Sequence, residues 1–200
     1  MATVAEPIPA AAVAQPRREV KIVPLAGLPI VAIVVVGMIV AIATNSQWGL
    51  DFYHVVGGGL WTAIDLFLGL VLGPIMGSMP LAARFELSSR LMPKLLLIMP
   101  TVVTMTLGSG FQLARELGNL TPTSPTHDWL LASYIVVGVM ATIALGLLEP
   151  ANIAVLFEMR KPKPNPERIA KLMKVFIYTA GITGLMQVAT LIIMTKVASI

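Results

Sequence analysis

Residues 52–76 read FYHVVGGGLWTAIDLFLGLVLGPIM, a nearly continuous apolar run that contains one histidine, His54, and one acidic residue, Asp65. A helix needs about 20 residues to cross a hydrocarbon layer of about 30 Å, so this run is long enough to span a membrane. Four more long apolar runs occur in the chain. The sequence therefore predicts an all-α fold, an integral membrane bundle of five transmembrane helices at residues 25–44, 52–76, 95–114, 129–148 and 175–195.

Lys and Arg residues are distributed unevenly over the gaps between these runs. Of the 14 basic residues, all except Arg115 and Lys196 lie before the first run, between the second and third, or between the fourth and fifth. Positive charge near helix ends is retained on the cytoplasmic side of a membrane. The alternation therefore predicts an N-terminus inside and a C-terminus outside. The residues on the predicted inner side are Arg17, Arg18, Lys21, Arg84, Arg90, Lys94, Arg160, Lys161, Lys163, Arg168, Lys171 and Lys174.

The composition excludes several classes of protein. Apolar residues make up 56% of the 200 residues and charged residues only 12%, which is typical of a membrane protein and not of a soluble domain. The absence of cysteine excludes disulfides, thiolate metal sites and cysteine nucleophiles. The basic residues do not share one soluble face with aromatic residues, so nucleic acid is not an expected partner. The expected partner is the lipid bilayer, with other membrane subunits or a second copy of the chain as further candidates.

The N-terminal part of the chain divides into a tail and an anchor. Residues 1–24 are rich in Ala, Pro and Val, and we expect them to form a disordered cytoplasmic tail ahead of a membrane domain at residues 25–200. The first apolar run has no polar residue between Leu25 and Ala43. We therefore expect it to face lipid.

Prolines predict where the connecting segments lie. Pro80 and Pro93 are expected to bound a short amphipathic stretch, residues 81–91, in a loop ahead of the third span. Three prolines within residues 161–167 predict an extended turn, because proline does not continue a helix. Apolar residues beyond the fourth run predict that its helix continues to Met159.

Four residues of the second run have the spacing of one helical stripe. His54, Gly58, Trp61 and Asp65 follow one another at i, i+4, i+7 and i+11. The stripe places Asp65 near mid-membrane, where an ionisable group is costly unless it is paired, neutral or faces protein or water. One interpretation makes Asp65 a functional residue. The other is that it is protonated or hydrogen-bonded to hydroxyl groups and only holds helices together.

Polar residues in the other spans are candidate partners for Asp65. Counted from the helix ends, Thr104, Thr142 and Gln187 reach the same central layer of the membrane. We expect spans two to five to form a bundle with these polar faces inward, although packing alone also accounts for each threonine. The predicted intramembrane polar positions are Asp65, Thr104, Gln112, Tyr134, Thr142 and Gln187.

His54 has two interpretations of its own. A histidine near a membrane surface often hydrogen-bonds only water or lipid headgroups. Alternatively, its imidazole ligates a haem, since histidine is the usual axial ligand and helical bundles commonly hold cofactors. The other histidine, His127, lies in the predicted outer loop and becomes the second ligand if that loop folds back over the bundle.

The second and third runs resemble a known family. The segment from His54 to Trp61 is similar to the first conserved helix of the bacterial membrane protein family that contains the protoporphyrinogen oxidase HemJ and the copper-resistance protein CopD. The resemblance covers about residues 51–134, and it implies a redox protein of the bacterial inner membrane, with haem b on His54 and Trp61 packed against the macrocycle. Further matching positions are Leu66, Phe67, Pro74, residues 90–100, Thr104, Gly108, Gly110 and Trp129.

The chain departs from this family at the positions that serve catalysis. The Lys that follows the third-helix Trp in the family is absent from residues 130–133, and Ile75 stands where the family has an Arg after the first-helix proline. The Asn-Glu-x-Pro pattern of the last helix has no counterpart near Tyr178. Of the functional positions, only His54 carries over. The resemblance therefore implies haem binding and not porphyrinogen oxidation, while the scattered methionines do not favour copper transport.

Three functions remain open on the sequence, and no catalytic residue is predicted for any of them. The chain contains no phosphate-binding loop, serine elbow or His-Glu-x-x-His motif. The first function is a haem-binding redox protein of the HemJ/CopD type. The second is a non-catalytic membrane subunit whose polar stripe packs against a partner. The third is a small proton-coupled transporter with a path through Asp65 and Gln187.

Overall fold

The computed structural model describes residues 22–200, and the predicted tail at residues 1–24 lies almost entirely outside this range. Within the described range the chain forms helices and no strand. Five of its helical segments are long and apolar enough to cross a membrane, beginning at Leu25, Gln47, Leu81, His127 and Pro166. The prediction of an all-helical chain with five such helices is confirmed.

Two of the five segments are continuous rods that change their helical winding midway. The second consists of α2, a π-helical stretch η2 and α3, and the fourth consists of α5, a π-helical stretch η3 and α6. The elements are a 3-10 turn η1 (Leu25–Gly27), α1 (Leu28–Ala43), α2 (Gln47–Leu66), η2 (Phe67–Leu72), α3 (Gly73–Ser78), α4 (Leu81–Glu116), α5 (His127–Ile143), η3 (Ala144–Leu148), α6 (Glu149–Arg160) and α7 (Pro166–Ala198).

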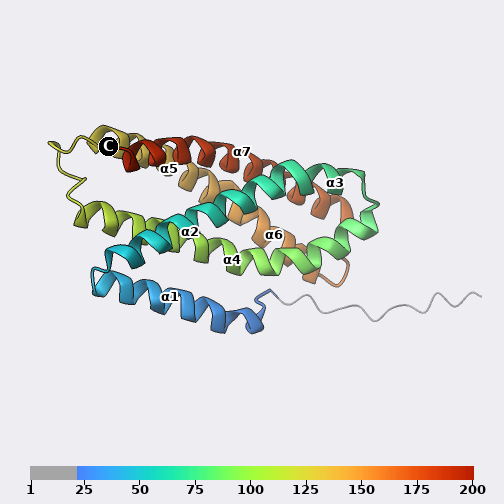
Figure 1. The fold of residues 1–200 in the computed structure, drawn as a ribbon. Helices are drawn as coiled ribbons and strands as arrows, with labels where there is room; N and C mark the ends of the chain where they lie inside the picture. The colour runs from blue at the N-terminus through green and yellow to red at the C-terminus, as the bar shows by residue number, and fades with distance from the viewer. Residues whose placement is uncertain (1–21) are drawn as a thin grey trace, which may run out of the picture.

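The helices after α1 surround one apolar core, whereas α1 lies on the outside of the bundle, beside α4 and α2 (Figure 1). Of the most apolar 18 residues within Leu25–Ala43, only 11% are buried, compared with 44% of the corresponding residues of α7. Its isoleucine and valine side chains are largely exposed. This exposure is what a lipid-facing anchor requires, because side chains in contact with lipid have no protein to pack against.

The third span differs from the prediction. The structure has no loop over residues 81–94, and α4 is one helix from Leu81 to Glu116 that contains both Pro93 and Pro100. Each proline removes one backbone hydrogen bond, to the carbonyl four residues earlier. Such a break is tolerated where packed neighbouring helices hold the rod, and Pro93 is buried in the bundle. Proline therefore predicted a boundary that tertiary packing overrides.

The fourth and fifth spans also extend beyond their apolar runs. The predicted continuation of the fourth helix to Met159 is confirmed, since α6 ends at Arg160. The predicted extended turn is shorter than expected, because α7 already begins at Pro166. Proline is favoured at the first helical position, where no hydrogen-bond donor is needed. Asn165 caps this end, and its Oδ1 accepts hydrogen bonds from the backbone N–H groups of Glu167 and Arg168.

Nearly all described basic residues lie at one end of the bundle, which we call the basic end. It holds the α3–α4 and α6–α7 turns, at the right of Figure 1, while Arg115 and Lys196 lie toward the opposite end. The 36 residues of α4 form a rod of about 54 Å, longer than a hydrocarbon layer of about 30 Å. The helices are therefore long enough to project beyond a membrane at the basic end.

Candidate functional site

The core contains a buried carboxyl group, that of Asp65, in the last turn of α2. The residue is 1% exposed. Its Oδ2 accepts hydrogen bonds from Nε1 of Trp61 at 3.0 Å, Oγ1 of Thr183 at 3.0 Å and Nε2 of Gln187 at 2.7 Å. Trp61 lies one turn earlier on α2, whereas Thr183 and Gln187 are on α7. The carboxyl group therefore ties the second span to the fifth.

Glycines allow the two rods to approach closely enough for these bonds. A Cβ atom added at Gly184 would lie 2.9 Å from the backbone nitrogen of Leu66. One turn further along, a Cβ atom on Gly69 would lie 2.3 Å from the Cα of Gly181. No side chain fits at either position without moving a backbone. Gly181 and Gly184 therefore set how closely α7 approaches the second span.

The other oxygen of this carboxyl group is left without a partner. Oδ1 of Asp65 is buried and accepts no hydrogen bond from any described residue, and the same holds for Oε1 of Gln187. A buried polar atom without a partner costs free energy, and a buried negative charge costs more. The site can hold an ionised carboxylate through the three donors on Oδ2. It can also accept a proton on Oδ1, which removes the charge and leaves those donors in place.

The spans contain a second acidic residue and two irregular helical segments. Glu149 is the first residue of α6. The π-helical η2 begins two residues after Asp65, and the π-helical η3 ends immediately before Glu149. π-helical turns are rare and frequently occur at functional sites. Both acidic groups therefore lie beside a break in regular α-helical winding.

The predicted stripe of the second span faces the protein interior. A Cβ atom added at Gly58 would lie 3.5 Å from the Thr106 methyl group on α4, and Trp61 is only 6% exposed within the central core. The Trp61 indole donates its N–H to Asp65, so its polar group is already engaged. The stripe thus joins α2 to α4 in its first half and to α7 in its second.

Several of the polar residues predicted to face the bundle interior lie elsewhere, among them two predicted partners of Asp65, Thr104 and Thr142. Thr104 is exposed, and Thr142 is exposed with its hydroxyl donating to the carbonyl of Gly138 on its own helix at 2.9 Å. Tyr134 is 40% exposed on the same helix. Gln112 lies near the C-terminal end of α4, where its Nε2 donates a hydrogen bond to Oδ1 of Asn45 at 2.9 Å. A threonine can face lipid because its hydroxyl bonds its own helix, so polarity alone did not indicate the buried face.

Thr183 is the site residue that the sequence analysis missed. It is 1% exposed and donates to Asp65 from the helix that also carries Gln187. The spacing of Thr183 and Gln187 is i, i+4, which places both on one face of a helix. That spacing would have indicated Thr183 once Gln187 was chosen as a partner.

His54 is on α2 and packs against α4, about three helical turns before Asp65 on the same stripe. Its Nδ1 lies 2.9 Å from the backbone carbonyl oxygen of Thr106, and its ring lies against Gly110, where an added Cβ would approach Nδ1 to 2.3 Å. A bond from Nδ1–H to a carbonyl oxygen fixes the tautomer that leaves Nε2 free to bind a metal. The imidazole therefore fits the role of a haem ligand. Trp61 does not fit beside it, because its indole is committed to the core and to Asp65.

The described residues contain no group of three or more His, Asp or Glu side chains that could hold a metal ion. His127 is the first residue of α5, at the opposite end of the bundle from the basic end. Comparison of the chain with protein-family models, with curated proteins and with solved structures gives no match.

Proposed function

We propose that the protein is a multi-pass membrane protein that takes up and releases a proton at Asp65, as a small proton-coupled transporter requires. The observation that carries this proposal is the asymmetric bonding of the carboxyl group. Three donors meet Oδ2, while Oδ1 is buried and has no partner among the described residues. Both protonation states are accommodated without rearranging the three donors. Ionisable groups within membrane spans commonly form proton relays and ion paths.

The close packing of α2–η2–α3 against α7 couples the protonation of Asp65 to the contact between these two rods. The Gly69–Gly181 contact lies one turn from Asp65, toward the basic end, and leaves no room for a side chain between the two backbones. Protonation changes how strongly Oδ2 holds Thr183 and Gln187, because hydrogen bonds to a charged acceptor are stronger. A change in charge at Asp65 therefore alters the strength of the interaction that holds these two rods together.

Infrared difference spectroscopy tests proton binding directly. Purified protein in lipid is titrated with acid and base, and the carbonyl stretching band of a protonated carboxyl group is followed. We expect a band that disappears at alkaline pH in the wild type and is absent from Asp65→Asn. Glu116→Gln, at the end of α4, is the matched control and should retain the band. A wild-type band that persists in Asp65→Asn would refute the proposal.

A haem-binding redox protein of the HemJ/CopD type is the second candidate. The observation in its favour is the Nδ1 contact between His54 and the Thr106 carbonyl oxygen, which leaves Nε2 available as an axial ligand. A bound haem would supply one-electron redox chemistry. Protein purified after expression with added haem should show a Soret band that shifts on reduction with dithionite and is lost in His54→Ala. If no haem is bound, this candidate is rejected.

We further propose that the basic end faces the cytoplasm of a bacterial cell and that the protein resides in the inner membrane. Support comes from the distribution of basic residues, which places nine at the basic end and two elsewhere among the eleven described. The bilayer is then its main partner. If neither proton nor haem binding is found, the remaining assignment is a non-catalytic subunit that packs against other membrane chains or a second copy.

A further inference from the structure

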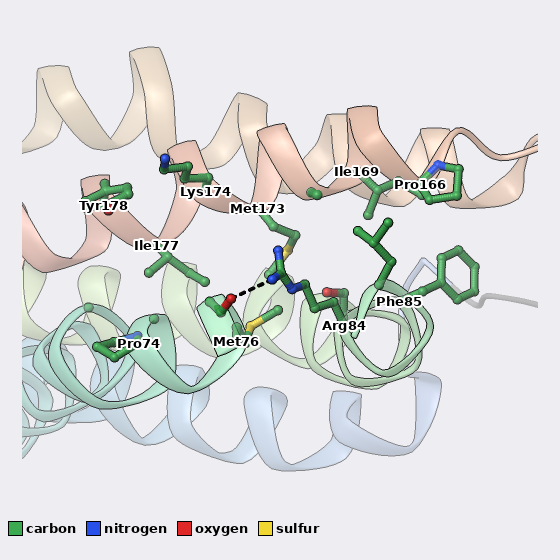
Figure 2. A pocket seen from close by; sticks show the side chains of 16 residues that line it. Pro74, Met76, Arg84, Phe85, Pro166, Ile169, Met173, Lys174, Ile177 and Tyr178 are labelled. Atoms are coloured by element: carbon green, nitrogen blue, oxygen red, sulfur yellow. Dashed lines mark hydrogen bonds between the residues drawn. The ribbon is translucent and has the colours of Figure 1, made fainter. Parts of the chain in front are cut away.

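A second site lies at the basic end, apart from Asp65. A cavity of about 410 Å³ opens between α3, the first turns of α4 and the first half of α7 (Figure 2). Its volume falls within the range of small-molecule sites, about 300–1,000 Å³. The Gly69–Gly181 contact lies at the end of the cavity nearer Asp65.

The lining of the cavity is apolar apart from a small cationic group. Two of its residues, Arg84 and Lys174, are cations, and within the described part of the chain no Asp or Glu lines it. Figure 2 shows the Arg84 guanidinium between the α3 side and the α7 side of the lining, with Met76 and Met173 near it. Lys174 is exposed, and its Nζ lies on the α7 side, 5.6 Å from the ring centroid of Tyr178 (Figure 2). An anion would meet attraction here and no opposing carboxylate.

Arg84 is held in place by the chain without being neutralised. Its Nε donates to the carbonyl oxygen of Met79 at 2.8 Å, and its Nη2 donates to that of Gly77 at 2.6 Å. These bonds fix the guanidinium at the end of α3. The Nη1 group has no hydrogen-bond acceptor among the described residues, and a guanidinium cannot lose its charge in a protein. Arg84 is half-buried. Its guanidinium is therefore oriented by the chain and still has a free N–H group that can bind an anionic oxygen.

Ser88 supplies an independent sign of a missing ligand. It lies one helical turn after Arg84 on α4, belongs to the lining of the cavity and is 0% exposed. Its Oγ has no hydrogen-bond partner among residues 22–200. Most serines inside helices donate to a carbonyl oxygen of their own helix, as Ser109 does here. A buried hydroxyl without any partner calls for one from outside the chain.

The rest of the cavity suits a hydrocarbon chain. Gly69, Gly73, Pro74 and Ile177 line it toward the middle of the bundle, and none of them offers a side-chain polar atom. We propose that the cavity binds an amphiphile with one acyl chain and an anionic oxygen headgroup. The headgroup contacts Arg84, Lys174 and Ser88, and the chain lies between α3 and α7. Neither the charge nor the hydrocarbon part of the site depends on the protonation of Asp65.

Photolabelling with a diazirine-bearing palmitate tests this site. The full-length protein is placed in nanodiscs of zwitterionic phosphatidylcholine, and labelled peptides are mapped by mass spectrometry. We expect saturable labelling of α3 and of the α7 segment around Ile177, which unlabelled palmitate prevents. Methyl palmitate lacks the charge and inorganic phosphate lacks the chain, so neither should compete at the same concentration. Competition by methyl palmitate would show that the cavity is only an apolar groove. Competition by inorganic phosphate would show that it binds free anions. Either result overturns the proposal.

Matched charge removals locate the headgroup. Arg84→Gln and Lys174→Gln should each weaken palmitate competition by about tenfold or more, the typical effect of losing a bond to a charged group. Arg90→Gln removes the same charge from an exposed position on the same helix, and Lys171→Gln does so on α7; both should bind as the wild type does. Equal binding by all four variants would refute the assignment. Since Arg84 also holds the end of α3, Lys174→Gln decides the question if Arg84→Gln does not fold.

Discussion

Replacing Asp65 by leucine should destabilise the bundle, and the structure gives the reason and the size of the effect. Leucine leaves Nε1 of Trp61 and Nε2 of Gln187 without their acceptor in a buried site. The hydroxyl of Thr183 is less affected, because the Thr179 carbonyl oxygen lies 3.1 Å from it and can accept instead. Two orphaned donors at about 1–3 kcal/mol each would cost about 2–6 kcal/mol. Burial of the leucine side chain returns about 2 kcal/mol of this.

The expected net loss is about 0–4 kcal/mol, and its midpoint of about 2 kcal/mol corresponds to a fall in melting temperature of about 4–8 °C for a chain of this size. Asp65→Asn should lose much less, because its side-chain oxygen can still accept all three hydrogen bonds. Thermal unfolding of the purified protein in a mild detergent, followed by helical circular dichroism, measures both variants. Melting temperatures for leucine and asparagine that agree within error would contradict the hydrogen-bond argument.

A threonine pair provides an internal control for this reasoning. Thr183→Val removes one bond to the buried carboxyl group, and hydrogen bonds between membrane helices contribute about 0.6 kcal/mol on average and at most about 1.7 kcal/mol. Thr142→Val removes a hydroxyl that is exposed and bonds only its own helix. We expect a measurable loss for the first and almost none for the second. In the Asp65→Leu background the loss from Thr183→Val should vanish, because contacting residues are not additive. Equal effects of the two valine substitutions would show that the carboxyl group does not hold α7.

Three further predictions concern packing, topology and the turn at the basic end. Gly69→Ala should lower the free energy of unfolding by about 1–3 kcal/mol, the typical effect of overpacking, because the new Cβ has no room against α7. Gly138→Ala should instead stabilise its helix, because no atom lies within 4 Å of the added Cβ. A cysteine at Lys163 should react with a membrane-impermeant maleimide only from the cytoplasmic side and one at Thr123 only from the outside, so labelling of both from one side would refute the orientation. Glu158→Gln should lower the melting temperature, because the buried carboxylate accepts a hydrogen bond from Nζ of Lys161 at 2.6 Å and lies 3.4 Å from Nε of Arg168. A variant that melts at the wild-type temperature at both high and low salt would contradict this role.

The sequence by itself determined the class of the protein and the number of its helical rods. Apolar runs long enough to cross a membrane predicted all five, because hydrophobic length is a local property of the chain. The same run that carries His54 and Asp65 predicted which side of α2 faces inward, since a helical stripe follows from spacing alone. Gln187 was found as a partner because its depth could be counted from the helix end. None of these inferences required knowledge of how one helix packs on another.

Only the tertiary structure decided where the helices end and which polar groups meet. Pro93 lies inside α4 because neighbouring helices hold a rod that the isolated sequence would break. Thr104 and Thr142 face outward and Thr183 faces Asp65, since a hydroxyl can be satisfied by its own helix and its polarity does not specify a direction. The unpartnered oxygen of Asp65 and the unpartnered hydroxyl of Ser88 are likewise products of packing. A missing hydrogen bond depends on every neighbour around the atom, and those neighbours come from segments far apart in the chain.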